Sequence, residues 1–177
     1  MLFSKVIQDN DPDFPKLLSL YEAAFPDNER LAPDRYTGRE GNEFIAFYKA
    51  DEKPLFAGFA WMLTKGDLSH ILYFAIEPAL RNEGLGTEAL RCLQGHFPGK
   101  RIIADVEDPD TNCPDPEERR RRIRFYERAG YCLTDIRYLW QNEFYLMMVQ
   151  GGTLTREEFS RFWEGDEENA VTYQGKA

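Results

Sequence analysis

The sequence predicts a mixed α/β fold with a central, mostly antiparallel sheet, and three observations support this class. β-Rich aromatic runs alternate with helical patterns along the 177-residue chain. Short polar turns join several neighbouring β-rich runs, which is typical of antiparallel hairpins. Residues 68–76, 85–97 and 101–106 are predicted to form strand, helix and strand, and such a crossover implies a parallel pair. We therefore expect one parallel pair of strands within the sheet and helices on its flanks.

The first half of the chain is predicted to form a strand, a helix and a three-strand meander. Residues 2–8 form the first strand, Asp11 begins the helix turn, and Phe25-Pro26 ends the helix. The polar segment 27–42 has little periodicity, which is typical of a loop, and substrate contacts are often found on such loops. The meander strands are expected at 43–50, 54–64 and 68–76.

The second half is predicted to contain a second crossover helix and a hairpin. The helix spans residues 117–129 and Gly130 ends it, and a hairpin of strands 131–139 and 143–149 follows. Thr155 and Glu158 have the spacing of a capping box, which predicts a C-terminal helix at 154–164. Residues 165–177 are expected to form a frayed tail on a single domain that spans residues 1–177.

The charge of the chain argues against a nucleic-acid partner. Thirty-one acidic and 22 basic residues give a net charge of −9, whereas phosphate contacts need an accessible basic face. One run is basic, from Arg119 to Arg122 and at Arg124, and acidic residues surround it. We interpret this run as the solvated face of a helix; the alternative is a local positive patch that attracts an anionic cofactor.

The sequence disfavours a membrane-spanning, secreted, disulfide-bonded or metal-binding protein. No apolar stretch approaches the roughly 20 residues of a spanning helix, and the N-terminus does not resemble a signal peptide. We therefore expect a cytoplasmic protein with no membrane partner. Three scattered cysteines and two histidines predict neither a disulfide framework nor a metal site.

A glycine motif at residues 81–87 predicts a phosphate-bearing ligand. It follows an apolar strand and opens an amphipathic helix. Gly84 and Gly86 have no Cβ, so the backbone can come close to a phosphate and can adopt positive φ, and Thr87 adds a hydroxyl. The exposed N–H groups and positive end of a helix suit a pyrophosphate. The alternative is a tight turn that only precedes a helix.

Two motifs resemble those of the GNAT superfamily of acyl-CoA-dependent N-acyltransferases. Arg81-Asn-Glu-Gly84-Leu-Gly86 is similar to the family's pyrophosphate loop, and residues 124–131 (RFYERAGY) are similar to its later "FYE…GY/F" helix. Together the motifs cover roughly residues 68–132 in the family's order. The predicted order of elements also matches that of the GNAT fold. The resemblance implies a GNAT domain that uses acetyl-CoA (coenzyme A) as its co-substrate and needs no metal.

The resemblance also implies where the cofactor binds. In the GNAT fold two central parallel strands splay apart, and pantetheine lies between them; here these strands are 68–76 and 101–107. Backbone groups of the first strand are then expected to bind pantetheine, and the loop amides to bind the pyrophosphate. The implied cofactor-binding residues are Phe74, Ala75, Ile76, Arg81, Asn82, Glu83, Gly84, Leu85, Gly86 and Thr87.

Acyl transfer from a thioester requires an uncharged amine, oxyanion stabilisation and a proton for the leaving thiolate. Tyr126 aligns with the family tyrosine near the thioester sulfur, so the resemblance implies that it is the general acid. A phenol with a pKa of about 10 is a suitable donor to a thiolate. The alternative is a helix aromatic that packs on the sheet.

Glu107 is the candidate general base, because it ends the second splayed strand, where the amine must approach. Asp105 lies on the same strand face and could share this task. Some family members use ordered water as the base instead. The alternative for Glu107 is an exposed acid at the end of a strand, with no catalytic role. Tyr73 could line the acceptor site or pack in the core. Glu29 and Arg30 could recognise substrate or face solvent.

The leading hypothesis is transfer of an acetyl or short acyl group to a primary amine of a small molecule or peptide. Gly84, Gly86 and Ala89 also fit a dinucleotide fingerprint, with Asp105 in the place of the ribose-binding acid, but seven residues separate the strand from Gly84. A non-catalytic CoA-binding or interaction module on the same fold is a third hypothesis. The aromatic final hairpin and the 154–163 helix could form a homodimer interface.

Overall fold

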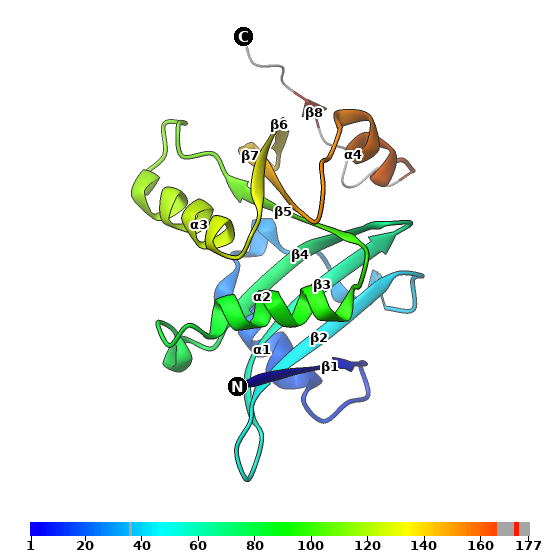
Figure 1. The fold of residues 1–177 in the computed structure, drawn as a ribbon, viewed down its shortest axis with the longest axis vertical. Coiled ribbons are helices and arrows are strands. Elements are labelled where there is room, and N and C mark those ends of the chain that lie inside the picture. Colours follow the sequence, from blue (N-terminus) through cyan, green and yellow to red (C-terminus); the bar gives the residue numbers. More distant parts are fainter. Residues whose placement is uncertain (36, 166–171, 174–177) are drawn as a thin grey trace. The chain divides into compact units, whose positions relative to one another are not determined.

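Figure 1 shows a computed structural model of the chain, which describes residues 1–35, 37–165 and 172–173. The chain forms two compact units, Met1–Pro98 and Gly99–Ala177. Each unit has its own strands and helices. None of the helices in the described residues is both long and apolar enough to cross a bilayer.

Four antiparallel strands form the sheet of the first unit, in the order β1-β2-β3-β4. The strands are β1 (Leu2–Ile7), β2 (Asn42–Lys49), β3 (Leu55–Lys65) and β4 (Leu68–Ile76). The four strands predicted for this half of the sequence match these bounds closely. Most residues of β2 and β3 are buried, because helices cover both faces of the sheet.

Helix α1 (Phe14–Ala24) packs its apolar stripe on one face of this sheet. The helix ends where the sequence predicts, since Phe25 has extended backbone and Pro26 follows it. Tyr21 contacts three aromatic rings of the sheet edge-to-face, those of Phe59, Trp61 and Tyr73, at ring-centroid distances of 6.2, 5.7 and 4.7 Å. The sheet residues of this core cluster are Ile7, Phe44, Ala46, Tyr48, Phe56, Phe59, Trp61, Tyr73 and Ala75.

Helix α2 (Leu85–His96) covers the opposite face, and Figure 1 shows α1 and α2 on the two sides of the four strands. Ile45 and Phe47 are fully buried on the face that α1 does not cover. A side-chain hydrogen bond also joins α2 to the edge strand, because the Leu2 N–H donates to Oε1 of Glu88 at 2.7 Å. The buried stripe of α2 is Leu85, Ala89, Leu90 and Leu93.

The second unit contains antiparallel strands in the order β5-β7-β6-β8. They are β5 (Arg101–Glu107), β6 (Cys132–Trp140), β7 (Glu143–Gln150) and β8 (Thr172–Tyr173). Strands β6 and β7 are the hairpin predicted from the sequence. The mixed α/β class, with mostly antiparallel strands flanked by helices, is therefore confirmed.

Helices α3 (Pro116–Arg128) and α4 (Arg156–Phe162) complete the second unit. The predicted capping box of α4 is present: the Glu158 N–H donates to Oγ1 of Thr155 at 3.2 Å, and the Thr155 N–H donates to Oε2 of Glu158 at 2.8 Å. The helix ends at Phe162, before the expected residue 164. Most of the expected frayed tail, at 166–171 and 174–177, lies outside the described residues.

Candidate functional site

The glycine motif lies between the end of β4 and the start of α2, as the sequence predicts. A short 3₁₀ turn, η3 (Pro78–Leu80), follows β4, and then the backbone enters the left-handed region twice, at Asn82 (φ 66°) and Gly84 (φ 79°). Only glycine and, less often, asparagine adopt this region readily. Gly86, by contrast, lies in the first turn of α2, where the missing Cβ matters for close approach and not for φ.

The N-terminus of α2 is suited to bind an anion. Gly84 is the N-cap residue and no side chain caps the first turn, so the N–H groups of Leu85, Gly86 and Thr87 have no intrahelical partner. A Cβ placed on Gly84 would meet no described atom within 4 Å, so the space beside it is open. These N–H groups and the positive end of the helix dipole favour a phosphate at this position.

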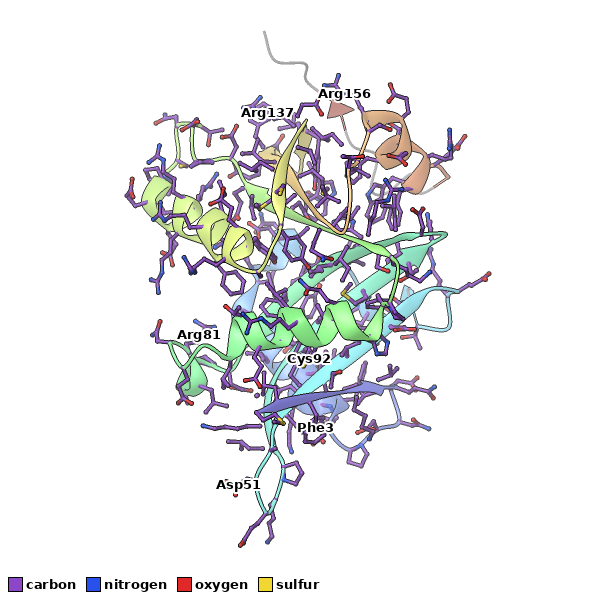
Figure 2. The ribbon with its side chains drawn as sticks, viewed as in Figure 1. Phe3, Asp51, Arg81, Cys92, Arg137 and Arg156 are labelled. Carbon is purple, nitrogen blue, oxygen red and sulfur yellow. The ribbon has the colours of Figure 1, made fainter. Side chains whose placement is uncertain are left out.

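Two charged residues of the motif have protein partners. Nε of Arg81 donates to the carbonyl of Ile76 at 3.1 Å, which ties the loop to the end of β4, and Figure 2 shows Arg81 beside the start of α2. Glu83 pairs with Nζ of Lys49 at 2.8 Å, and this hydrogen bond raises the pKa of the lysine. The negative charge that Glu83 brings to the loop is therefore balanced, and an anionic ligand meets less repulsion.

The end of β4 is held rigidly against β3. Residues Phe74, Ala75 and Ile76, which the resemblance assigns to pantetheine, pair with β3. A Cβ on Gly58 of β3 would lie only 2.3 Å from the carbonyl oxygen of Ala75, so this close approach requires glycine. The Glu77 N–H also donates to the carbonyl of Ala57 at 2.9 Å. The loop therefore begins from a fixed point.

Tyr126 belongs to α3 of the second unit and is buried, with 6% of its surface exposed. Its ring contacts Tyr131 edge-to-face at a centroid distance of 5.2 Å and also contacts Phe125. Within residues 1–35 and 37–165, the Tyr126 hydroxyl has no hydrogen-bond partner. The packing holds the Tyr126 ring in place, and its hydroxyl is available to donate a proton.

The electrostatics around Tyr126 keep its hydroxyl protonated. Burial raises its pKa well above the usual value, the carboxylates of Asp105 and Glu107 raise it further, and the Arg122 guanidinium lowers it. The phenol is therefore neutral at physiological pH and can donate a proton but cannot act as a base.

Both candidate bases on β5 have polar partners that the sequence did not reveal. Glu107 ends the strand and forms an ion pair with Arg122 of α3. Asp105 accepts a hydrogen bond from the Tyr138 hydroxyl at 2.7 Å. Because both partners are distant in sequence, no local pattern could have shown them.

The basic run of α3 is solvent-exposed at Arg121, Arg122 and Arg124, as interpreted from the sequence, but Arg119 departs from that interpretation. Arg119 is buried and donates to both oxygens of Glu143, at 2.9 and 3.0 Å, and to the carbonyl of Asp108 at 3.1 Å. Arg120 pairs with Glu117 and Asp110. The solvated-face interpretation is wrong for Arg119, and these acids neutralise much of the proposed positive patch. Arg119 instead holds the β5–α3 loop to β7.

Tyr73 anchors the loop after α1. Its hydroxyl donates to the carbonyl of Glu29 at 2.6 Å and accepts from the Leu31 N–H at 2.9 Å, and the Tyr21 hydroxyl donates to the carbonyl of Leu31 at 2.8 Å. Arg30 forms an ion pair with Asp27. The Tyr73 ring is therefore a core residue whose hydroxyl fixes residues 29–31. Sequence reasoning did not foresee this role.

The dinucleotide hypothesis is not consistent with this geometry. Its fingerprint needs a glycine directly after the first strand of a βαβ unit. Here η3 and further loop residues separate Ile76 from Gly84, and β4 follows an antiparallel meander. Gly84, Gly86 and Ala89 therefore match the dinucleotide fingerprint in sequence, but the backbone around them does not have the geometry of a dinucleotide-binding βαβ unit.

Solved structures share the fold of the chain. A Bacteroides thetaiotaomicron protein assigned to the GNAT family of acetyltransferases is 25% identical with a TM-score of 0.73, over 94% of this chain and 99% of that one. The ribosomal-protein-S18-alanine N-acetyltransferase of Escherichia coli is 18% identical with a TM-score of 0.61, over 88% and 97% of the two chains. An acetyltransferase of Bacillus subtilis in complex with CoA is 15% identical with a TM-score of 0.60, over 86% and 100%.

Sequence comparison identifies the family directly. Among curated proteins, no sequence matches the chain. Residues 5–131, most of the chain, match the description "Acetyltransferase (GNAT) family". This match includes the glycine loop and the helix that carries Tyr126. The chain therefore belongs to the acetyltransferase (GNAT) family.

Proposed function

We propose that the protein transfers an acetyl group from acetyl-CoA to a primary amine of a small molecule or peptide. The observation that carries this proposal is the uncapped N-terminus of α2 behind the left-handed Gly84, in a chain of the GNAT family. This end of the helix presents backbone N–H groups to the pyrophosphate. Arg81 lies on the same loop and adds positive charge.

In the proposed reaction the neutral amine nitrogen attacks the thioester carbonyl carbon directly. A C–N bond forms, the C–S bond breaks, and CoA leaves as a thiolate. Tyr126 donates its proton to that thiolate, which its unengaged hydroxyl supports. The amine loses its proton to a base, for which Glu107 is the candidate, with Asp105 or an ordered water as alternatives.

The names of two structural neighbours agree with this chemistry. The Escherichia coli neighbour is named for acetylation of an alanine amine on a ribosomal protein, and the Bacillus subtilis neighbour was solved with CoA. Both share the fold at low identity, so they support the reaction class and not the acceptor. The expected cofactor is accordingly acetyl-CoA, with no metal.

Two measurements test the proposal. We expect calorimetry to detect CoA binding, and free-thiol release from acetyl-CoA to rise when primary amines are added. A folded protein that does not bind CoA contradicts the cofactor assignment. CoA binding without turnover across a broad panel of amines contradicts catalysis and supports a non-catalytic CoA-binding module instead.

A further inference from the structure

A pocket in the first unit lies between α1 and the loop that follows it. Its volume is about 690 Å³. Among the described residues, its lining includes the apolar or aromatic side chains of Phe14, Leu18, Tyr21 and Leu31 and the charged side chains of Asp9, Glu22, Arg30 and Asp34. A pocket of this size accommodates a small organic ligand.

The walls of the pocket are held in place by the core. Phe14 and Tyr21 are buried residues of the α1 cluster, and Leu18 and Leu31 pack against it. The hydroxyls of Tyr21 and Tyr73 fix the backbone of Leu31. The apolar part of the pocket is therefore preformed and suits hydrocarbon.

The charged residues of the pocket are mostly acidic. Asp9, Glu22 and Asp34 are exposed, and none of their carboxylates has a side-chain partner among the described residues. Among the described lining residues the one cation is Arg30, which forms an ion pair with Asp27 and also donates to the carbonyl of Glu22 at 3.3 Å. In the part of the pocket that the structure describes, an apolar wall lies beside carboxylates without side-chain partners, which complements a cation that carries hydrocarbon.

We infer that this pocket binds the acceptor substrate, and that the acceptor is an amine with at least two cationic nitrogens joined by hydrocarbon. The inference rests on the proposed function, because it names the class of amine that is acetylated. Tyr73, which fixes the pocket loop, is adjacent to Phe74 on β4, where pantetheine is expected. One nitrogen is held by the carboxylates while the other, uncharged, attacks the thioester.

The test compares three probes of equal length but different charge. Calorimetry of the full chain with CoA bound uses 1,5-diaminopentane, pentylamine and 5-aminopentanoate, which carry two, one and no net positive charges. We expect the diamine to bind about fivefold tighter than pentylamine and at least about tenfold tighter than 5-aminopentanoate, and its affinity to fall as salt rises. Equal affinities for the three probes overturn the inference.

Charge-neutral variants test the named residues. The triple variant Asp9→Asn, Glu22→Gln, Asp34→Asn is expected to weaken diamine binding about tenfold and to leave pentylamine binding less affected. The matched control is Glu52→Gln in the β2–β3 turn, an exposed acid outside the pocket, which should change diamine binding less than about twofold. Diamine binding that the triple variant retains in full overturns the inference.

Turnover separates this inference from the proposed function. If amines are acetylated but the diamine has no advantage in binding or in kcat/KM, the enzymatic function holds and the acceptor class is wrong. If the diamine binds as expected but no amine is acetylated, the charge recognition holds and the acetyltransferase function fails. CoA affinity of each variant, measured in the same way, shows that the first unit has kept its fold.

Discussion

Single residues of the glycine loop have separable tasks. Gly84 provides the left-handed turn that starts α2, Gly86 keeps the first helical turn free of side chain, and Arg81 ties the loop to the end of β4. Gly95, near the other end of α2, has ordinary helical backbone and open space around it. The two glycines Gly84 and Gly95 therefore form a natural matched pair, because the same substitution has opposite physical consequences.

Gly84→Ala is expected to lower stability by roughly 1–2 kcal/mol, since alanine resists a φ of 79°. It is also expected to weaken CoA binding about tenfold, because the new methyl group enters the open space beside Gly84 where we propose that the pyrophosphate binds. Gly95→Ala should instead stabilise the protein by roughly 0.5–1 kcal/mol and leave CoA affinity unchanged. For each variant, urea unfolding measures the change in stability and CoA titration measures the change in CoA affinity. Equal CoA affinity in the two variants would count against a pyrophosphate at this helix end.

Tyr126→Phe removes the hydroxyl and keeps the ring that packs on Tyr131. We expect kcat to fall by at least about 10²-fold with little change in CoA affinity, because the thiolate loses its proton donor. Phe125→Leu, on the same helix, is the control for a change in packing alone. Steady-state kinetics measures kcat of each variant, and calorimetry measures its CoA affinity. An unchanged kcat in Tyr126→Phe rejects the general-acid role.

At the scale of the element, long-range ion pairs hold the helices of the second unit in place. Arg119 fastens the β5–α3 loop to β7 through Glu143, and the hydrogen bonds from this guanidinium lower the pKa of the carboxyl. Arg101 of β5 donates to Glu158 of α4 at 2.8 Å, in addition to the capping box. The helix start is encoded locally, whereas its attachment to the sheet depends on a residue far away in sequence.

The hydrogen bond from Arg101 and that from the Thr155 N–H lower the pKa of Glu158 from 4.5 to about 2. Because the folded-state pKa is depressed, this stabilisation is complete above about pH 4.5 and is lost as pH falls towards 2. Glu158→Gln keeps a capping side chain and loses the ion pair. We expect the variant to be less stable than the parent at pH 7 and the difference to shrink below pH 4.5 in urea unfolding.

The control for this pH dependence is Glu157→Gln, since Glu157 is an exposed acid in the same helical turn. Its stability difference from the parent should change little between pH 7 and pH 3. A constant difference between Glu158→Gln and the parent over that range would mean that the ion pair with Arg101 does not form in solution.

At the scale of the whole molecule, the two compact units contain different parts of the proposed machinery. The glycine loop and the acidic pocket belong to the first unit, and Tyr126 and Glu107 belong to the second. The proposed reaction therefore needs both units. The sequence prediction of one domain over residues 1–177 requires that they unfold together.

We expect one cooperative transition in calorimetric unfolding, with a midpoint that rises when CoA is added, because a ligand that binds only the folded state stabilises it. At about 100 times its Kd, CoA should add about 2.7 kcal/mol. The variant Gly84→Ala should show a smaller rise at the same CoA concentration. Two separate transitions, of which CoA shifts only one, would contradict the single-domain prediction.

Much of the fold follows from local chemistry. Alternating β-rich runs predicted the strands of both units closely, and the Thr155–Glu158 spacing predicted the start of α4. The residues of the glycine loop and of the Tyr126 helix also show the resemblance to the family. The loop is recognisable because a turn that binds phosphate restricts which residues it can contain. These features depend on neighbours a few positions away, so one sequence is enough to find them.

The tertiary structure decided which polar groups are engaged and which remain available. Arg122 pairs with Glu107, Tyr138 donates to Asp105, and Tyr73 fixes the loop at residues 29–31. Within residues 1–34 and 37–165, the same folding leaves the carboxylates of Asp9 and Glu22 without side-chain partners beside an apolar wall. Such pairings join residues that are far apart in the chain, and only the folded backbone determines which of them meet.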